Sequence, residues 1–424
     1  MPPQARLLFL FFLLCTLPFF VVACESDSQP LGGQEDSTET QSQEDLSEYR
    51  DPGTGPFEEV AEEDLIERCG LDPEILASID AETTYPYAIV RYGLLCHEHY
   101  PAEAVGPDEI VENYSATKTL AAAVVGLAVK MSADLDYPLS DTDRMDQWVD
   151  AITFNPDAQV AHVLAMVGHS ESLAYGLREF SYDAAGTVQI NRLSEVVEAV
   201  IAQDPPQFQN VETTGEFARK FLFEPLGMTH SEWGGEIFGF SWKSNLRDMA
   251  RLGLVLTHDG VYDQERLLPE DWVYKMTHPA FEDANTAYGY LTWLAAKSHH
   301  KVPLYDEFID FPLGDCQPAS LWREYPHGLS ESTDCEYLPT DSCEQVFDAG
   351  VFAAVGYEGQ IIAGHPGLDL VLVTKNSGTG FVSTPWDLIR RALVEHDTTY
   401  PGDEDAFCEA YAAGEYAPDL ILLP

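Results

Sequence analysis

The segment from residue 113 to residue 130, NYSATKTLAAAVVGLAVK, contains a run that is apolar on every side of a helix. From Thr119 to Val129 the chain reads TLAAAVVGLAV, without a charged residue. A helix that has no polar face must be buried inside a domain. We therefore predict a central helix from about residue 115 to residue 131, with the rest of the fold built around it.

Strand patterns lie near both ends of the chain, and helical patterns fill most of the middle. Residues 86–100 predict a hairpin that turns at Gly93, residues 287–296 a strand, and residues 349–378 three consecutive strands. We expect an α/β fold of the α+β type, with an antiparallel sheet formed by both chain ends and flanked by helices. A mainly helical lobe would be inserted at about residues 132–245.

The first residues are typical of a bacterial lipoprotein signal peptide, which we expect at residues 1–23. Arg6 precedes a short apolar run that ends in VVAC, so cleavage would leave Cys24 to receive lipid. An ordinary cleaved signal or an uncleaved anchor is the alternative. Residues 24–58 are acidic and poor in large apolar side chains, which predicts a disordered tether. The folded domain would then cover residues 59–424, with a cysteine-containing insertion at about 297–347. We expect an exported protein, anchored to the membrane of the bacterial cell envelope.

Charge and cysteine content limit the partners. The 424 residues carry 72 Asp and Glu against 22 Lys and Arg, a formal net charge of −50, which disfavours binding to nucleic acid. Of eight cysteines, six would remain beside Cys15 and Cys24, enough for up to three disulfides whose pairing the sequence does not give. CHEH places His97 and His99 on one face of a strand, which we interpret as ordinary strand residues and not as a metal site.

Ser115 and Lys118 are three residues apart at the start of the buried helix, so their side chains share a face. Burial favours the neutral form of a lysine amine, and a neutral amine beside a hydroxyl can take its proton. The pair therefore predicts an activated serine nucleophile. The alternative is a plain helix cap at Ser115 with Lys118 extending to solvent. A second Ser-x-x-Lys, at Ser298 and Lys301, opens no apolar helix.

Several segments resemble the serine β-lactamase-related superfamily, which includes class C β-lactamases, DD-peptidases, esterases and 6-aminohexanoate-dimer hydrolases. NYSATKTLAAAVVGLAV is similar to its nucleophile helix, and FLFEPLGMTHSEW at 221–233 to a signature of its class C-like branch. Three further segments resemble the family and follow in the same order along the chain: residues 244–273, YGYLTW and FAAVGYEGQ. The resemblance covers about residues 85–397 and implies a β-lactamase/DD-peptidase-like fold.

The resemblance implies three catalytic elements, of which the first is Ser115 with Lys118. The second would be Tyr182 in FSYDAAG, which would exchange a proton between the serine and the leaving group. Ala184 replaces the family's asparagine, and Tyr175 is a rival for the tyrosine.

The third element would be Ala354-Val355-Gly356, where the family has a Lys or His before Thr-Gly. A glycine at Gly356 would let substrate lie against the strand, and the backbone N–H groups of Tyr357 and Ser115 would bind the oxyanion. Ala354 cannot pair with a substrate carboxylate, so neutral or cationic substrates are expected.

These features predict a lipoprotein serine hydrolase that cleaves an ester or amide of a small molecule through an acyl-enzyme on Ser115. No cofactor, metal or nucleic acid is expected. The alternatives are penicillin-binding, β-lactamase or DD-peptidase-like activity, or a non-catalytic binding lipoprotein on a decayed hydrolase fold.

Overall fold

The computed structural model describes residues 46, 49–150, 154–170, 173, 180–182, 184–281, 284–285, 288–294, 299–303, 322–326, 351–378 and 392–394. The expected signal peptide, Cys24, Tyr175 and Ser298 lie outside these residues, as do Cys316, Cys335, Cys343 and Cys408. No helix within the described residues is long and apolar enough to cross a membrane.

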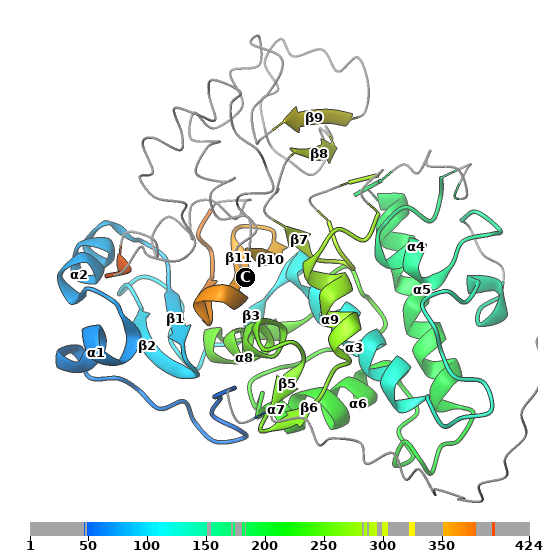
Figure 1. Ribbon diagram of the computed structural model, residues 1–424, viewed down its shortest axis with the longest axis horizontal. Helices are drawn as coiled ribbons and strands as arrows, with labels where there is room; N and C mark the ends of the chain where they lie inside the picture. Colours follow the sequence, from blue (N-terminus) through cyan, green and yellow to red (C-terminus); the bar gives the residue numbers. More distant parts are fainter. Residues whose placement is uncertain are drawn as a thin grey trace, which may run out of the picture. The chain divides into compact units, whose positions relative to one another are not determined.

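An antiparallel sheet joins strands from both ends of the chain, in the order β2-β1-β12-β11-β10-β7 (Figure 1). Its strands are β1 (Tyr87–Arg91), β2 (Leu94–His99), β7 (Trp293–Leu294), β10 (Phe352–Gly356), β11 (Gln360–His365) and β12 (Leu370–Thr374). The first and last strands of the sequence pair directly, with Ile89 opposite Leu372. The predicted hairpin, the predicted run of three strands and the sheet built from both ends are confirmed.

Both faces of the sheet are covered by helices, which explains why β1 is apolar at successive positions. Ala88 and Val90 point into the larger core, whereas Tyr87 and Ile89 point into a second core under α1 and α2. The period of two in a strand produces this alternation. Figure 1 shows α1 and α2 beside β1 and β2. On the other face, α8 packs against β11 and β12.

Helices connect the strands and cover the sheet. They are α1 (Leu65–Cys69), α2 (Pro73–Glu82), α3 (Thr117–Met131), α4 (Val160–Leu164), α5 (Ala184–Ile201), α6 (Thr214–Ala218), α7 (Glu224–Leu226), α8 (Leu246–Thr257) and α9 (Glu270–Thr277). Short turns precede or connect them at η1 (Glu62–Asp64), η2 (Tyr114–Ala116), η3 (Met145–Gln147), η4 (Arg219–Phe223) and η5 (Pro366–Leu368). Two-residue strands pair as β3 (Val111–Glu112) with β4 (Lys243–Ser244), and β5 (Val261–Tyr262) with β6 (Glu265–Arg266). The helices between residues 132 and 245 agree with the expectation that this segment is mainly helical. That it forms a separate lobe stays a prediction.

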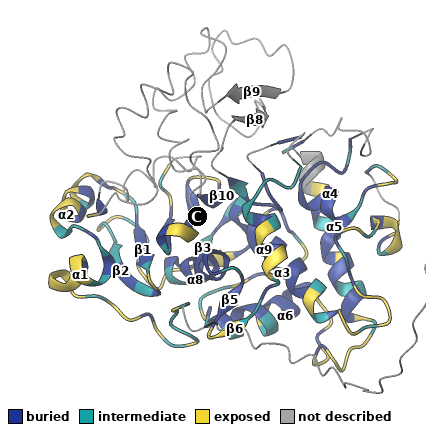
Figure 2. Ribbon diagram, in the orientation of Figure 1, coloured by how far each residue is buried: buried dark blue, intermediate teal, exposed yellow. Residues whose placement is uncertain are grey.

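Helix α3 is the central helix that the apolar run predicts. Every residue from Thr117 to Ala128 is buried, and Figure 2 shows the helix almost wholly in the colour of buried residues. Trp272 of α9 packs so closely on it that a Cβ added at Gly126 would lie 2.3 Å from the indole. The Trp272 indole N–H donates to the Ala122 carbonyl oxygen at 3.0 Å. These contacts fix the helix, and therefore fix the position of its first turn.

Two regions differ from the expectation. Among the described residues of the strand predicted at 287–296, only Trp293–Leu294 form a strand, because Gly289 N–H donates to the Thr292 carbonyl oxygen and closes a turn before it. Within the expected insertion, β8 (His299–Pro303) pairs with β9 (Trp322–Pro326).

The last part of the expected tether is packed against the body of the protein. Phe57 is buried, and the Arg251 guanidinium donates to the carbonyl oxygens of Gly53 and Gly55. A Cβ at Gly93 would meet the Arg50 carbonyl oxygen at 2.2 Å, so the hairpin turn and this segment are in close contact. Residues 49–57 therefore belong with the folded body.

A disulfide joins Cys69 at the end of α1 to Cys96 in β2. It ties the second core to the edge of the sheet across a sequence separation of 27 residues. The other expected disulfides involve cysteines outside the described residues.

Candidate active site

The candidate nucleophile lies in a turn before α3 and not in the helix itself. Ser115 is the middle residue of η2, and α3 begins at Thr117. Tyr114 has φ 46°, a left-handed conformation that non-glycine residues rarely adopt. This backbone turns the chain sharply before the serine, which the expected helix start at residue 115 did not include.

Lys118 contacts Ser115 directly. Its Nζ lies 3.1 Å from Ser115 Oγ and donates to the Gly239 carbonyl oxygen at 3.0 Å. The residue is only 3% exposed. The alternative of a helix cap with a solvent-exposed lysine does not describe this geometry, because no side-chain cap is formed at either end position of η2 or α3.

Tyr182 lies beside the lysine. Lys118 Nζ is 4.7 Å from the centre of its ring, and the ring packs on Trp293 with centroids 5.2 Å apart. The Tyr182 hydroxyl makes no hydrogen bond to another residue that the structure describes. Tyr182 therefore lies beside the Ser115–Lys118 pair, and the contact with the Lys118 amine is made by the face of its ring and not by its hydroxyl.

Strand β10 forms the opposite wall. On the side away from β11, it is paired with β7 only at Phe352 and Ala353 among the described residues, so its last residues face η2. A Cβ added at Gly356 would lie 2.2 Å from the Asn113 carbonyl oxygen. The glycine is therefore needed for close contact between the two backbones, in addition to any contact with substrate.

A buried polar network supports the turn that holds Ser115. Lys375 Nζ donates to Asn113 Oδ1 at 2.6 Å, and Asn113 Nδ2 donates to Ser244 Oγ at 2.7 Å. The Asn113 carbonyl oxygen accepts the N–H of Ala116 at 3.1 Å. Lys375 is 1% exposed, and burial lowers its pKa to about 7, against the opposing effect of the Glu112 and Asp248 carboxylates.

Aromatic and acidic side chains lie close to Ser115. The Tyr357 ring meets the Tyr114 ring edge-on, with centroids 5.5 Å apart. Phe240, next to the Gly239 carbonyl that binds Lys118, is exposed. Burial raises the pKa of Tyr114, and the nearby Glu358 and Glu112 carboxylates raise it further.

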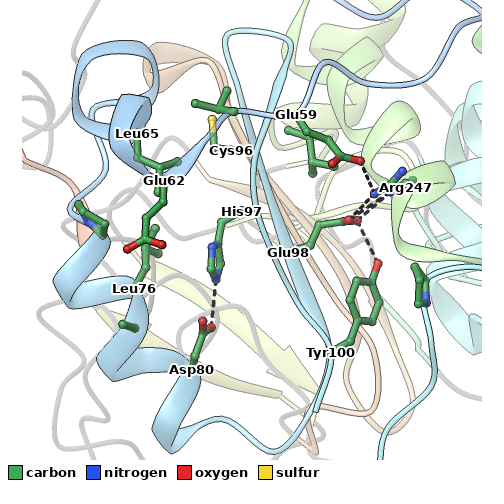
Figure 3. Close-up of a pocket in the computed structure, with 15 residues that line it drawn as sticks. Glu59, Glu62, Leu65, Leu76, Asp80, Cys96, His97, Glu98, Tyr100 and Arg247 are labelled. Atoms are coloured by element: carbon green, nitrogen blue, oxygen red, sulfur yellow. Dashed lines mark hydrogen bonds and ion pairs between the residues drawn. The ribbon is translucent and has the colours of Figure 1, made fainter. Parts of the chain in front are cut away.

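A separate hollow of about 480 Å³ lies between α2 and β2 (Figure 3), and it is lined by none of the candidate catalytic residues. Its charged groups are mostly paired with one another. His97 and His99 both contact Asp80, at 3.0 and 3.2 Å, which confirms that they share a face. Burial would raise the pKa of Asp80, but hydrogen bonds from His97 and Tyr87 hold it below its usual value.

On the other side of this hollow, Arg247 binds Glu98 and Glu59 (Figure 3). No group of three or more His, Cys, Asp or Glu side chains within the described residues could hold a metal ion.

The structure brings together most of the residues predicted from the sequence. Ser115 and Lys118 are in contact, and Tyr182 lies beside the lysine. Gly356 is the last residue of β10, and Tyr357 follows it. Sequence reasoning missed the Gly239 carbonyl and the network of Asn113 and Lys375. Their loops and strand ends carry no motif, so only the folded chain reveals them.

No protein-family model matches the chain, and no curated protein matches it. Solved structures that are similar to it include a family VIII carboxylesterase, with a TM-score of 0.48 and 13% identity over 80% of this chain and 98% of that chain. Another is a β-lactamase/D-alanine carboxypeptidase from Pseudomonas syringae, with a TM-score of 0.46 and 12% identity over 80% and 100%. A third is a β-lactamase from Mycobacterium bovis, with a TM-score of 0.44 and 17% identity over 81% of this chain and 100% of that chain.

These structures are of the kinds that the sequence resemblance names, β-lactamases and carboxylesterases. Because their identities and TM-scores are low, the proposal for function rests on the geometry around Ser115.

Proposed function

We propose that the protein is a serine hydrolase that cleaves an ester or amide bond through an acyl-enzyme on Ser115. The observation that carries the proposal is the 3.1 Å contact between Ser115 Oγ and the Nζ of a lysine that is 3% exposed. A hydroxyl in contact with a sheltered amine has a base at hydrogen-bonding distance, which is the geometry that an activated serine needs.

Acylation would begin when Ser115 Oγ attacks the carbonyl carbon of the substrate and its proton passes to Lys118 Nζ. The Gly239 carbonyl oxygen accepts one hydrogen of this amine, which would hold the nitrogen in place beside the serine. The proton would then move to the departing alcohol or amine, with Tyr182 beside the lysine as the group that carries it. Water would release the acid from Ser115 by the reverse sequence.

The oxyanion would be bound by the backbone N–H groups of Ser115 and Tyr357. The contact between Gly356 and Asn113 holds β10 against the turn of the nucleophile, so it would set the distance between the two donors. Removing one such donor costs about 10²–10³ in rate in hydrolases of this kind. The Tyr357 side chain is not needed for this donation.

The substrate would be a neutral or cationic ester or amide. Ala354 is buried in β10 and has no charge to offer a carboxylate. The net charge of −50 repels anions from the whole surface. We further propose that the protein is exported and held on the cell envelope by lipid at Cys24, without binding nucleic acid.

The test is hydrolysis of p-nitrophenyl acetate by the protein without residues 1–23 and by its Ser115→Ala variant. We expect the variant to lose at least about 10³-fold in kcat, since the nucleophile is removed, and to keep its near-ultraviolet circular dichroism. Ser140→Ala, a serine in a surface turn, is the matched control and should retain full activity. Equal activity of the wild type and Ser115→Ala would refute the proposal.

Two other functions have specific observations in their favour. The contact between Ser115 and Lys118 would also serve a penicillin-binding protein or β-lactamase, although Ala354 lacks the cation for the β-lactam carboxylate. Replacement of two family positions by Ala184 and Ala354 would suit a non-catalytic binding protein. Faster turnover of a cephalosporin than of esters would favour the former, and absence of any turnover by the wild type the latter.

A further inference from the structure

Two tyrosine rings lie beside the candidate nucleophile and next to the proposed oxyanion donors. Tyr114 directly precedes Ser115, and Tyr357 directly follows Gly356. Their ring centroids are 5.5 Å apart at an interplanar angle of 80°. Tyr357 is 63% exposed, so its ring is accessible to a ligand in solution. An accessible aromatic surface therefore adjoins the reacting serine.

The hairpin between β10 and β11 brings Tyr357 and Glu358 to the turn of the nucleophile. The Gly359 N–H donates to the Gly356 carbonyl oxygen at 3.1 Å, which closes a turn around these two residues. Glu358 has φ 61° in this turn, and Tyr114 has φ 46° in the turn before Ser115. Because β10 contacts η2, the two turns lie next to each other.

The side chains beside these two rings carry negative charge. Glu358 is exposed and forms no ion pair with another described residue. It lies near enough to the Tyr114 phenol for its carboxylate to raise the pKa of that group, in addition to the effect of burial. Glu112 adds to the field, although its carboxylate accepts the Ser241 N–H at 2.6 Å and it lies opposite Lys243 in the β3–β4 ladder. Glu358 is thus the carboxylate that is open to a ligand.

Aromatic rings beside a carboxylate attract ammonium groups, because the negative face of each ring and the carboxylate act on the same cation. We propose that Tyr114, Tyr357 and Glu358 bind a quaternary or protonated ammonium group of the substrate, so that the enzyme prefers cationic esters to neutral esters of the same shape. The inference rests on the proposed function, since it names the substrate class of the same site. The proposed function explains only why anionic substrates are disfavoured, since Ala354 carries no charge. The ammonium site would in addition attract cationic substrates.

The experiment compares two thioesters that differ in charge and hardly in shape. Acetylthiocholine carries a quaternary nitrogen, and neohexyl thioacetate has a carbon atom in its place. We expect kcat/KM of the wild type to be about tenfold higher for acetylthiocholine, as for a cation held by an exposed ring and a carboxylate. Thiol release is measured at low ionic strength and again at high salt, where screening should reduce the preference.

Variants then separate the parts of the site. Glu358→Gln removes the charge and Tyr357→Leu removes the ring, and each should lower the ratio of the two kcat/KM values to about threefold. Tyr357→Phe keeps the ring and should keep a ratio of about tenfold. Glu62→Gln is the matched control for loss of one exposed carboxylate, because Glu62 lines the separate hollow, and it should leave both rates unchanged.

The outcomes distinguish the inference from the proposed function. Turnover of both thioesters with a ratio near one in the wild type would overturn the ammonium site and leave the serine hydrolase intact. A tenfold ratio that neither Glu358→Gln nor Tyr357→Leu changes would also overturn it. Turnover of neither thioester would refute the hydrolase and the ammonium site together.

Discussion

Substitution of Gly356 by alanine should damage catalysis far more than it damages the fold. A Cβ at this position would lie 2.2 Å from the Asn113 carbonyl oxygen, and both atoms belong to or adjoin backbone. Since even close C···O contacts are about 3.3 Å long, β10 and the turn of Ser115 must separate by about 1 Å. Displacement by about 1 Å costs on the order of 100-fold in rate when it misplaces reacting groups.

The assay is kcat for p-nitrophenyl acetate, corrected for the folded fraction from urea denaturation. Gly364→Ala is the matched control, because its Cβ would lie 2.3 Å from the Phe352 ring in the same sheet, away from Ser115. We expect Gly356→Ala to lose about 100-fold in kcat. Gly364→Ala should lose about 1–3 kcal/mol in free energy of unfolding through overpacking and keep its kcat. If Gly356→Ala retained the wild-type kcat, the close contact would not position the oxyanion donors.

Three further predictions concern stability. Burial lowers the pKa of Lys375 to about 7, so above that pH the unfolded chain binds more protons than the native protein. The free energy of unfolding should therefore rise by about 2 kcal/mol from pH 7 to pH 9. Urea denaturation of Lys375→Met should lack this rise. Burial also lowers the pKa of His365 to about 4, so the free energy of unfolding should fall as the pH drops from about 6.5 towards 4, and His365→Phe should show a smaller fall. Loss of the disulfide in the double variant Cys69→Ala, Cys96→Ala should lower the free energy of unfolding by about 3 kcal/mol without changing kcat. A lower kcat of the folded variant would contradict this.

Local patterns of the sequence were enough to predict most of the sheet. The hairpin at Gly93 and the three consecutive strands at the end of the described chain alternate or run apolar between turn residues, and the structure has them there. The strand predicted at 287–296 was placed to begin too early, because β7 begins at Trp293. Its aromatic residues have strand propensity, but the turn between Gly289 and Thr292 uses the backbone groups that a longer strand would need.

The site was predictable only where its residues are close in sequence. Ser115 and Lys118 are three positions apart, so the short turn η2 and its continuation into α3 are enough to bring them together. Asn113 and Lys375 are 262 residues apart, and the Gly239 carbonyl reaches Lys118 from a loop. Contacts of this kind depend on how the sheet closes, and neither composition nor spacing contains that information.

Labelling of Ser115 by a fluorophosphonate tests the central claim most directly, because the probe reacts only with a serine whose proton can be taken. Peptide mapping by mass spectrometry would locate the adduct, and Lys118→Met would remove the proposed base while keeping an unbranched side chain in the core. We expect one adduct, on Ser115, and a labelling rate at least about 10²-fold lower in Lys118→Met. An unlabelled wild type, or equal labelling rates in both proteins, would contradict the account.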